Sequence, residues 1–183
     1  TTLQTTSVAD VQSWQHNLLS PNTQYAFQVA ATNAGGDSAK TTAYAAWTLA
    51  MTPVAPVVNH PERDSLDVAI GTGDGNPAFT PYAIQISPAI SGNTWIQTDG
   101  TLGSGAVFRT ATAWGTMTVT GLDEGAFYSL AVIARNGADV LTAVGPSTTK
   151  KTFVLMPVAG AMGFVALMGL LTTLGIYRNR RRK

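Results

Sequence analysis

The side chains that could carry out catalysis or bind a metal are few and are scattered along the chain. Histidine occurs only at His16 and His60 in 183 residues, far apart in the sequence. The stretch "HPERDS" (60–65) contains His, Asp and Ser. Adjacency in sequence does not build a catalytic triad, however, because its members are recognised by their geometry and roles. A zinc site needs three or four ligands, so two histidines do not predict one.

The glycine-rich stretch "GTGDGNP" (71–77) is typical of a turn and not of a phosphate-binding loop. No helical pattern follows it, and no Lys-Ser/Thr pair closes it. A calcium ion needs six to eight oxygen ligands, and no run of sequence concentrates enough carboxylates; the candidates are Asp74, Asp99, Asp123 and Glu124. We therefore predict no enzymatic activity, no cofactor and no metal, and we do not expect a small-molecule ligand. A catalytic domain upstream of Thr1 stays open as a weaker alternative.

Charge is distributed unevenly along the chain. Residues 1–152 hold six Lys/Arg against ten Asp/Glu, a balance of −4, whereas the last six residues hold five bases. The acidic body makes nucleic acid an unexpected partner. The absence of cysteine excludes disulfides and thiolate metal sites.

The C-terminal segment predicts a membrane span. Residues 153–177 contain no charged side chain, and the 21 residues from Pro157 to Tyr177 make a helix of about 31 Å, enough to cross a hydrocarbon core. Basic residues favour the cytoplasmic side of a span. The prediction is a single-pass protein in the lipid bilayer, with residues 1–152 extracytoplasmic (periplasmic or cell-surface) and a basic cytoplasmic tail, residues 178–183, that carries Arg178, Arg180, Arg181, Arg182 and Lys183.

Small residues follow one stripe of this predicted helix. Because small side chains let a second helix approach closely in lipid, they predict docking onto other transmembrane subunits; the stripe is Ala159, Gly163, Ala166 and Thr173. The alternative is that Gly and Ala are simply frequent in membrane helices.

The rest of the chain shows the alternation of β-strands and contains two copies of one pattern. In "QYAFQVAATN" (24–33) and "FYSLAVIARN" (127–136), every second residue is apolar. Five identities match at a single offset of 103 residues: Leu19/Leu122, Tyr25/Tyr128, Val29/Val132, Ala31/Ala134 and Asn33/Asn136. A period of this size indicates tandem domains, each with its own core.

Both copies resemble fibronectin type III domains. A Leu six residues before a Tyr marks the tyrosine corner of that family, and Leu19–Tyr25 and Leu122–Tyr128 have this spacing. The resemblance implies an all-β, immunoglobulin-like sandwich in which the tyrosine hydroxyl bonds to the upstream backbone. It also implies strands within residues 52–58, 65–71, 81–87, 115–122, 126–136 and 141–152 of the second copy.

The first copy is incomplete, since the residues before Leu19 have room for one or two strands only. Either upstream residues complete this sandwich or a partner covers its apolar face. The predicted organisation is therefore a partial domain (1–50), a complete domain (51–152), a transmembrane helix (153–177) and a basic tail (178–183).

Trp95 and Trp114 flank the long insert of residues 92–114. They are candidate partner contacts, although the usual burial of Trp favours the alternative that each fills an edge of the core. The leading functional hypothesis is a non-catalytic accessory or scaffolding subunit of a larger membrane complex. The alternative is a membrane-anchored adhesion or carbohydrate-binding protein. The tail also resembles bacterial sorting signals, but it lacks their Pro-Glu-Pro type motif.

Overall fold

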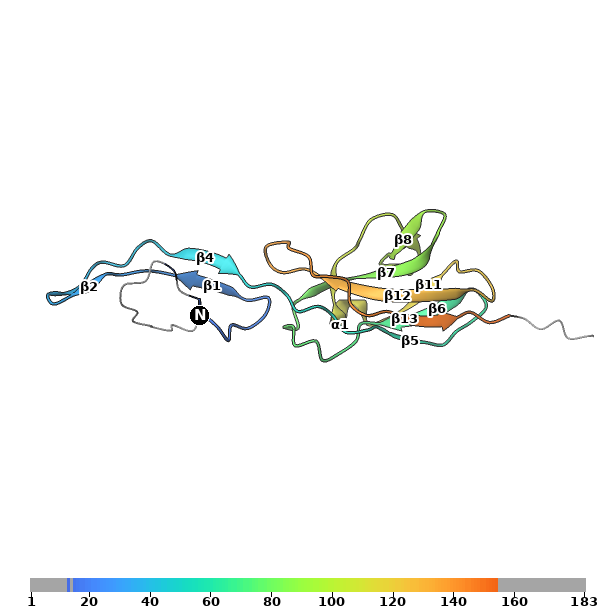
Figure 1. The fold of residues 1–183 in the computed structure, drawn as a ribbon. Helices are drawn as coiled ribbons and strands as arrows, with labels where there is room; N and C mark the ends of the chain where they lie inside the picture. Colours follow the sequence, from blue (N-terminus) through green and yellow to red (C-terminus); the bar gives the residue numbers. More distant parts are fainter. Residues whose placement is uncertain (1–12, 14, 155–183) are drawn as a thin grey trace, which may run out of the picture. The chain divides into compact units, whose positions relative to one another are not determined.

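The computed structural model describes residue 13 and residues 15–154 (Figure 1). All of its strands belong to one compact unit, which ends at Phe153. In this part of the chain, no helix is long and apolar enough to cross a membrane. The predicted span lies outside the described residues from position 155 onward, and so do its small-residue stripe and the basic tail.

Residues 57–151 form two antiparallel sheets. The first has the strand order β11-β6-β5 and comprises β5 (Val57–Asn59), β6 (Ser65–Ala69) and β11 (Thr116–Thr120). The second has the order β13-β12-β7-β8-β9; its strands are β7 (Pro81–Ile90), β8 (Asn93–Ile96), β9 (Leu102–Gly103), β12 (Phe127–Ala134) and β13 (Thr148–Lys151). The six strand regions predicted for the second copy each overlap one of these strands, and β5 and β7 extend beyond the predicted bounds.

One apolar core joins the two sheets. Alternate residues of β6 and β11 turn toward alternate residues of β7 and β12, and all of them belong to one cluster of buried side chains: Leu66, Val68, Val119, Ile84, Ile86, Leu130 and Val132. Ile70 is also buried. Each large aliphatic side chain buried in this way contributes about 1.5–3 kcal/mol. The second copy is therefore an all-β sandwich.

The long insert stays on the sheet of β7. Residues Arg109–Thr110 (β10) pair with Pro81 and Tyr82, on the edge of β7 that faces away from β12. A single helical turn, α1 (Ala111–Trp114), follows; the hydroxyl of Thr110 accepts a hydrogen bond from the N–H of Ala113 at its start. The sequence pattern did not predict this turn.

The first copy is a hairpin in the described residues. β1 (Gln24–Phe27) pairs with β4 (Tyr44–Trp47), and a short β2 (Thr32–Asn33) pairs with β3 (Gly36–Asp37) beyond them. The residues before Leu19 have room for one or two strands, but residues 15–20 form none. Phe27 and Tyr44, paired across the hairpin, are 41% and 73% exposed. Their shared face lacks, in the described residues, the opposing sheet that covers its counterpart in the second copy.

Candidate functional site

The predicted tyrosine corners place a hydroxyl against the upstream backbone in both copies. The Oη atom of Tyr128 accepts a hydrogen bond of 2.9 Å from the N–H of Asp123, and the Oη atom of Tyr25 accepts one of 2.9 Å from the N–H of Ser20. Tyr128 is 1% exposed and Leu122 beside it is 5% exposed. Leu19 and Tyr25 of the first copy are half-buried.

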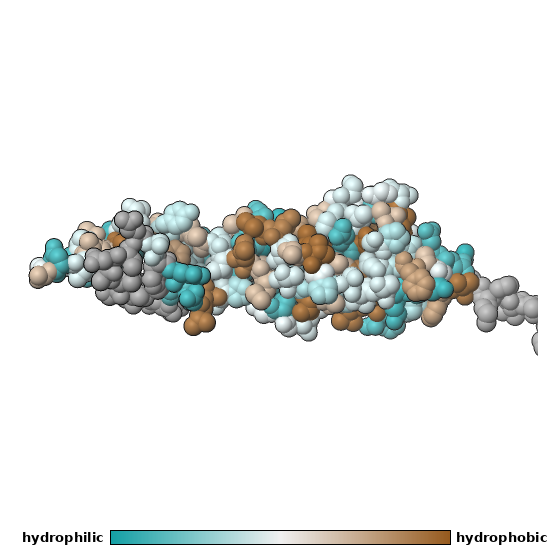
Figure 2. Space-filling view, viewed as in Figure 1, coloured by the Kyte–Doolittle hydropathy of each residue, from teal (hydrophilic) through white to brown (hydrophobic). Residues whose placement is uncertain are grey.

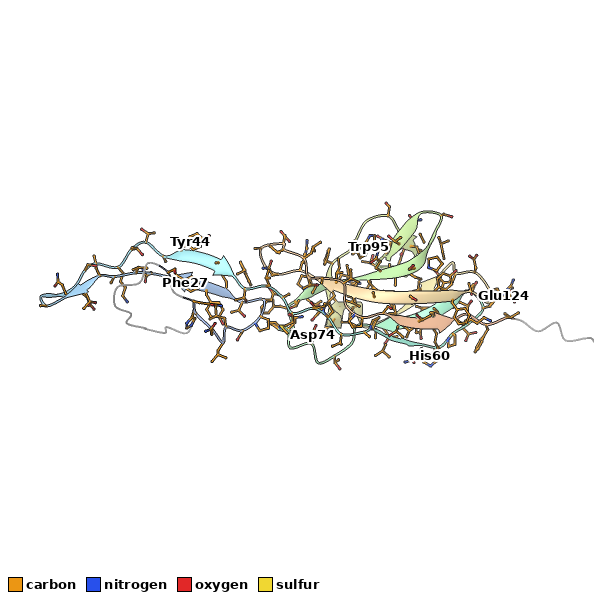
Figure 3. The ribbon with its side chains drawn as sticks, in the orientation of Figure 1. Phe27, Tyr44, His60, Asp74, Trp95 and Glu124 are labelled. Atoms are coloured by element: carbon orange, nitrogen blue, oxygen red, sulfur yellow. The ribbon has the colours of Figure 1, made fainter. Side chains whose placement is uncertain are left out.

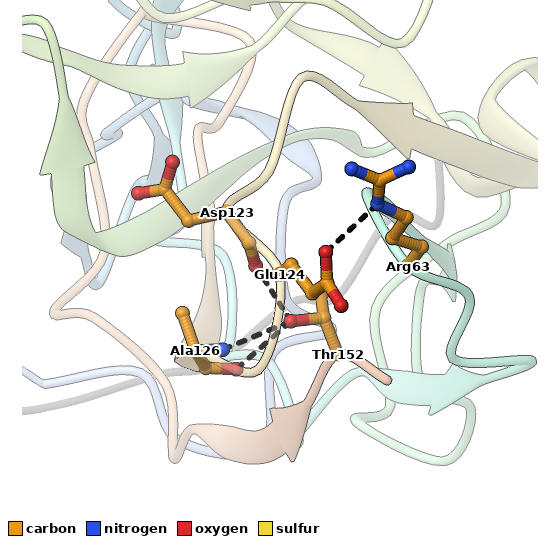
Figure 4. A network of polar contacts seen from close by, with 5 residues as sticks. All are labelled: Arg63, Asp123, Glu124, Ala126 and Thr152. Carbon is orange, nitrogen blue, oxygen red and sulfur yellow. Dashed lines mark hydrogen bonds and ion pairs between the residues drawn. The ribbon is translucent and has the colours of Figure 1, made fainter. Parts of the chain in front are cut away.

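A threonine at the end of the last strand closes the second copy. The hydroxyl of Thr152 donates to the carbonyl of Asp123 at 2.6 Å and accepts from the N–H of Ala126 at 3.0 Å (Figure 4). The N–H of Thr152 donates to the Ala126 carbonyl at 3.0 Å, and the Gly125 N–H donates to the Phe153 carbonyl at 3.2 Å. We call this group of bonds the clasp of the second copy.

The first copy contains the same clasp. The hydroxyl of Thr48 donates to the carbonyl of Ser20 at 2.7 Å and accepts from the N–H of Thr23 at 2.9 Å. The N–H of Thr48 donates to the Thr23 carbonyl, and the Asn22 N–H donates to the Leu49 carbonyl, each at 3.0 Å. The loop residues are related by the 103-residue offset, and the closing threonines by 104. Sequence matching at one fixed offset therefore missed the clasp.

An ion pair lies beside the second clasp. The Nε atom of Arg63, in the loop between β5 and β6, lies 2.8 Å from a carboxylate oxygen of Glu124 (Figure 4). The Phe153 N–H also donates to the carbonyl of Glu62 in the same loop, at 2.8 Å. Because both charged side chains are partly exposed, the ion pair contributes at most about 1 kcal/mol. The backbone bond is the firmer link between this loop and the chain end.

The first copy meets the second through buried polar side chains. Asn22 is 1% exposed; its Nδ2 atom donates to Oγ1 of Thr80, and its Oδ1 atom accepts from the N–H of Gly137, each at 2.9 Å. The Nδ2 atom of Asn136 donates to the carbonyl of Thr48 at 3.0 Å. We call this group of contacts the junction.

The ring of Trp47 closes the junction. A Cβ atom added at Gly137 would lie 2.4 Å from that ring, so only glycine fits there without displacing it. The identity Asn33/Asn136 had a physical basis, because both amides accept backbone N–H bonds in the turn after their strand. The role of Asn22 and Thr80 had no such signal, because their contacts join residues 58 and 115 positions apart.

Asp74 of the glycine-rich turn serves structure. Its carboxylate accepts hydrogen bonds from the Asn76 backbone at 3.0 Å, the Asn76 amide at 2.8 Å and the Tyr82 hydroxyl at 2.7 Å. Asn76 in turn bonds both the N–H and the carbonyl of Met51. Figure 3 shows Asp74 at one end of the sandwich and Glu124 toward the other. The turn thus fixes the chain where it enters the second copy.

The electrostatics of the buried tyrosines follow from their surroundings. Burial raises the pKa of Tyr82, and its hydrogen bond to the Asp74 carboxylate raises it further. Burial also raises the pKa of Tyr128, and the hydrogen bond from the Asp123 backbone N–H partly opposes this increase. Exposed Asp99 has a lowered pKa, because the side chain and backbone of Thr101 both donate to it. Neither tyrosine has the lowered pKa that would make it a nucleophile.

The two tryptophans have different surroundings. Trp114 is 3% exposed, and its indole N–H donates to the Tyr82 carbonyl at 2.8 Å. The prediction that Trp114 contacts a partner is therefore corrected, because its side chain is part of the core. Trp95 lies on β8 between Gln85 and Gly103 and is half-buried, so it keeps an accessible face (Figure 3).

The candidate catalytic residues do not converge. His60 pairs with Asp67 at 3.1 Å on the surface, and among the described residues no group of three or more His, Asp or Glu side chains could hold a metal. Every buried side-chain nitrogen and oxygen in the described part of the chain has a hydrogen-bond partner. The polar side chains described above are used to bond segments of the chain to one another.

Comparison with known proteins finds no matching family model and no matching curated protein. Similar solved structures include fibronectin type III domains. The human fibronectin type III domain containing protein 3 is 19% identical with a TM-score of 0.40, covering 60% of this chain and 92% of that one. Domains d3-d4 of the rat CD45 extracellular region are 16% identical with a TM-score of 0.42, covering 84% and 76%. The assignment of the fold rests on the strand pairing and shared core of this chain.

Removing the Tyr128 hydroxyl tests the tyrosine corner. Tyr128→Phe leaves the partly buried N–H of Asp123 without its acceptor, so the free energy of unfolding should fall by about 1 kcal/mol or more. Tyr44→Phe removes an exposed hydroxyl and should change it by under about 0.5 kcal/mol. Urea unfolding of the purified full chain measures both. Equal midpoints for the two variants would contradict a structural role for the corner.

Removing the Thr80 hydroxyl tests the junction. Thr80→Val has nearly the same shape but leaves the buried amide of Asn22 without its acceptor, at a cost of about 1–3 kcal/mol. It should also move the indole N–H resonance of Trp47 in an NMR spectrum. Thr116→Val, on an exposed position of β11, should do neither. A Trp47 resonance that is identical in all three proteins would refute the coupling of Asn22 to Trp47.

Proposed function

We propose that this chain is a non-catalytic scaffolding protein of a membrane complex. Its β-sandwich stands on the extracytoplasmic side, and its C-terminal segment spans the bilayer and docks onto other transmembrane subunits. The observation that carries the proposal is the second clasp: its last tied residue, Phe153, is also the first residue of the uncharged segment 153–177. Hydrogen bonds therefore hold the chain against the sandwich as far as the first residue of the uncharged segment.

The use of the polar side chains supports a structural role. Asp74, Tyr82 and Tyr128, which could have carried chemistry, are bonded to one another or to backbone groups. The junction and the clasps make the chain firm at both ends of the second copy. Such fixed connections suit a scaffolding domain that holds its neighbours in a set orientation, because a flexible linker would let each domain reorient freely.

The alternative is an adhesion or carbohydrate-binding protein, and one observation favours it. Trp95 is half-buried on β8, beside β9 at the edge of the sheet. A partly exposed aromatic ring is a common anchor for a protein partner. The burial of Trp114 leaves Trp95 as a single ring, so the scaffolding function is supported better.

Docking of the span is tested by a bulky substitution in its small-residue stripe. Gly163→Leu should hold two helices apart and weaken assembly, while the greater apolarity of Leu preserves insertion. Met168→Leu, predicted to lie on the other face, should have no effect. The measurement is the fraction of tagged protein that migrates with a large complex on a native gel after mild detergent extraction. Wild-type migration of Gly163→Leu would reduce the span to a passive anchor and favour the adhesion alternative.

A further inference from the structure

We propose that the end of the second sandwich at which β13 finishes lies against the surface of a lipid bilayer. We call it the exit end and define it by Phe127, Lys151 and Phe153. The inference rests on the proposed membrane anchor and goes beyond it, because an anchored domain can also stand away from the bilayer on a linker.

The first copy has a corresponding end, where β4 finishes, and the two clasps allow these ends of the two copies to be compared position by position. In the first copy, the chain leaving the clasp enters another protein domain. Two side chains of that exit end grip the domain: Asn22 bonds Thr80 and Gly137, and the ring of Trp47 packs on Gly137. Both are suited to a protein surface, because the amide finds hydrogen-bond partners and the ring finds a matching glycine.

The second copy carries different side chains at the same positions. Gly125 stands where Asn22 stands, so the gripping amide is absent. Lys151 replaces Trp47, and Phe127 replaces Gln24, its partner across the strands. Phe153 replaces Leu49, whose carbonyl closes the first clasp. The clasp backbone is retained, while the side chains that would hold a further protein domain are exchanged for two aromatic rings and a lysine.

These side chains have the exposure and chemistry that the membrane interface favours. Phe127 is 63% exposed, and Phe153 is 56% exposed. The Nζ atom of Lys151 lies 5.3 Å from the ring centroid of Phe127. A lysine can lay its aliphatic stem along apolar groups and keep its ammonium in water, which is how it behaves at the edge of a bilayer. The space-filling view shows apolar side chains at the surface where β13 ends (Figure 2).

The bonding of Phe153 keeps these residues near the bilayer. Phe153 is bonded through its N–H to Glu62 and through its carbonyl to Gly125, and the uncharged segment 153–177 starts at Phe153 itself. The exit end and this segment therefore share Phe153, and only three residues separate Phe153 from Pro157, where the predicted helix of 21 residues begins.

Charge selects the kind of lipid surface. The loops at this end and the end of β13 carry three bases and four carboxylates, a balance of −1: Arg63, Lys150, Lys151, Glu62, Asp64, Asp123 and Glu124. A nearly neutral surface gains little from anionic headgroups, which attract clusters of basic residues. The contact should therefore form on zwitterionic phosphatidylcholine.

A fluorescent reporter attached to an introduced cysteine tests the contact, since the chain has no cysteine of its own. Glu62→Cys places it at the exit end, and Val140→Cys places it beyond the opposite end of β12, whose eight residues span about 26 Å. The full chain is reconstituted in phosphatidylcholine vesicles that contain headgroup-labelled quencher lipids. The reporter at 62 should be quenched several-fold more than the reporter at 140. Phe127→Ser should reduce that difference, whereas Phe79→Ser, exposed elsewhere, should leave it unchanged.

Vesicle flotation separates the two levels of the proposal. Floating protein with equal quenching at both positions would overturn the lipid contact and leave the anchor standing. Protein that fails to float would overturn the anchor and, with it, the contact. Quenching at 62 that is unaffected by Phe127→Ser would remove Phe127 from the contact surface and contradict the role given to the exit end.

Discussion

A single hydroxyl at the end of the last strand determines how each copy is connected to the next segment of the chain. Thr48 and Thr152 each donate to a carbonyl and accept from an N–H of the loop that carries the tyrosine corner. The net gain from each bond is about 1 kcal/mol, and leaving the partly buried backbone groups of this loop without partners adds a cost. The strand end and the loop must therefore stay together for either to remain folded, and the tyrosine hydroxyl fixes the same loop from inside.

The core provides the frame that these bonds complete. Burial of the facing sides of β6, β7, β11 and β12 holds the two sheets together. This apolar contact does not depend on the side chains at the two ends of the sandwich. The ends are specialised independently. The end near Asp74 and Asn136 receives the first copy through buried amides, and the other end presents exposed phenylalanines. One fold can thus carry a protein junction at one end and a different kind of surface at the other.

Local features were predictable from the sequence. Leu122 and Tyr128 are close in sequence, so the tyrosine corner could be recognised from a short stretch of residues. The alternation of apolar residues in 127–134 directly indicates that one face of this strand is buried. The contacts of Asn22 with Thr80 and Gly137 were not predictable, because they depend on where two distant loops meet. Trp114 was ambiguous, since its burial depends on a helical turn within an insert that has no periodic pattern. Residues 15–20 form no strand, and in the described residues no opposing sheet covers the face that Phe27 and Tyr44 share.

Amide hydrogen exchange of the full chain tests the clasp. It thereby tests the claim that residues 152 and 153 are held firmly against the loop of residues 123–126. The N–H groups of Gly125 and Ala126 lie in a loop, where unbonded amides exchange within the time of an unstructured chain. If the clasp holds, both should exchange about as slowly as amides paired between β12 and β13, because opening them requires the strand end to detach. The variant Thr152→Val should release that protection. Loop-like exchange of Gly125 and Ala126 in the unmodified chain would contradict the account.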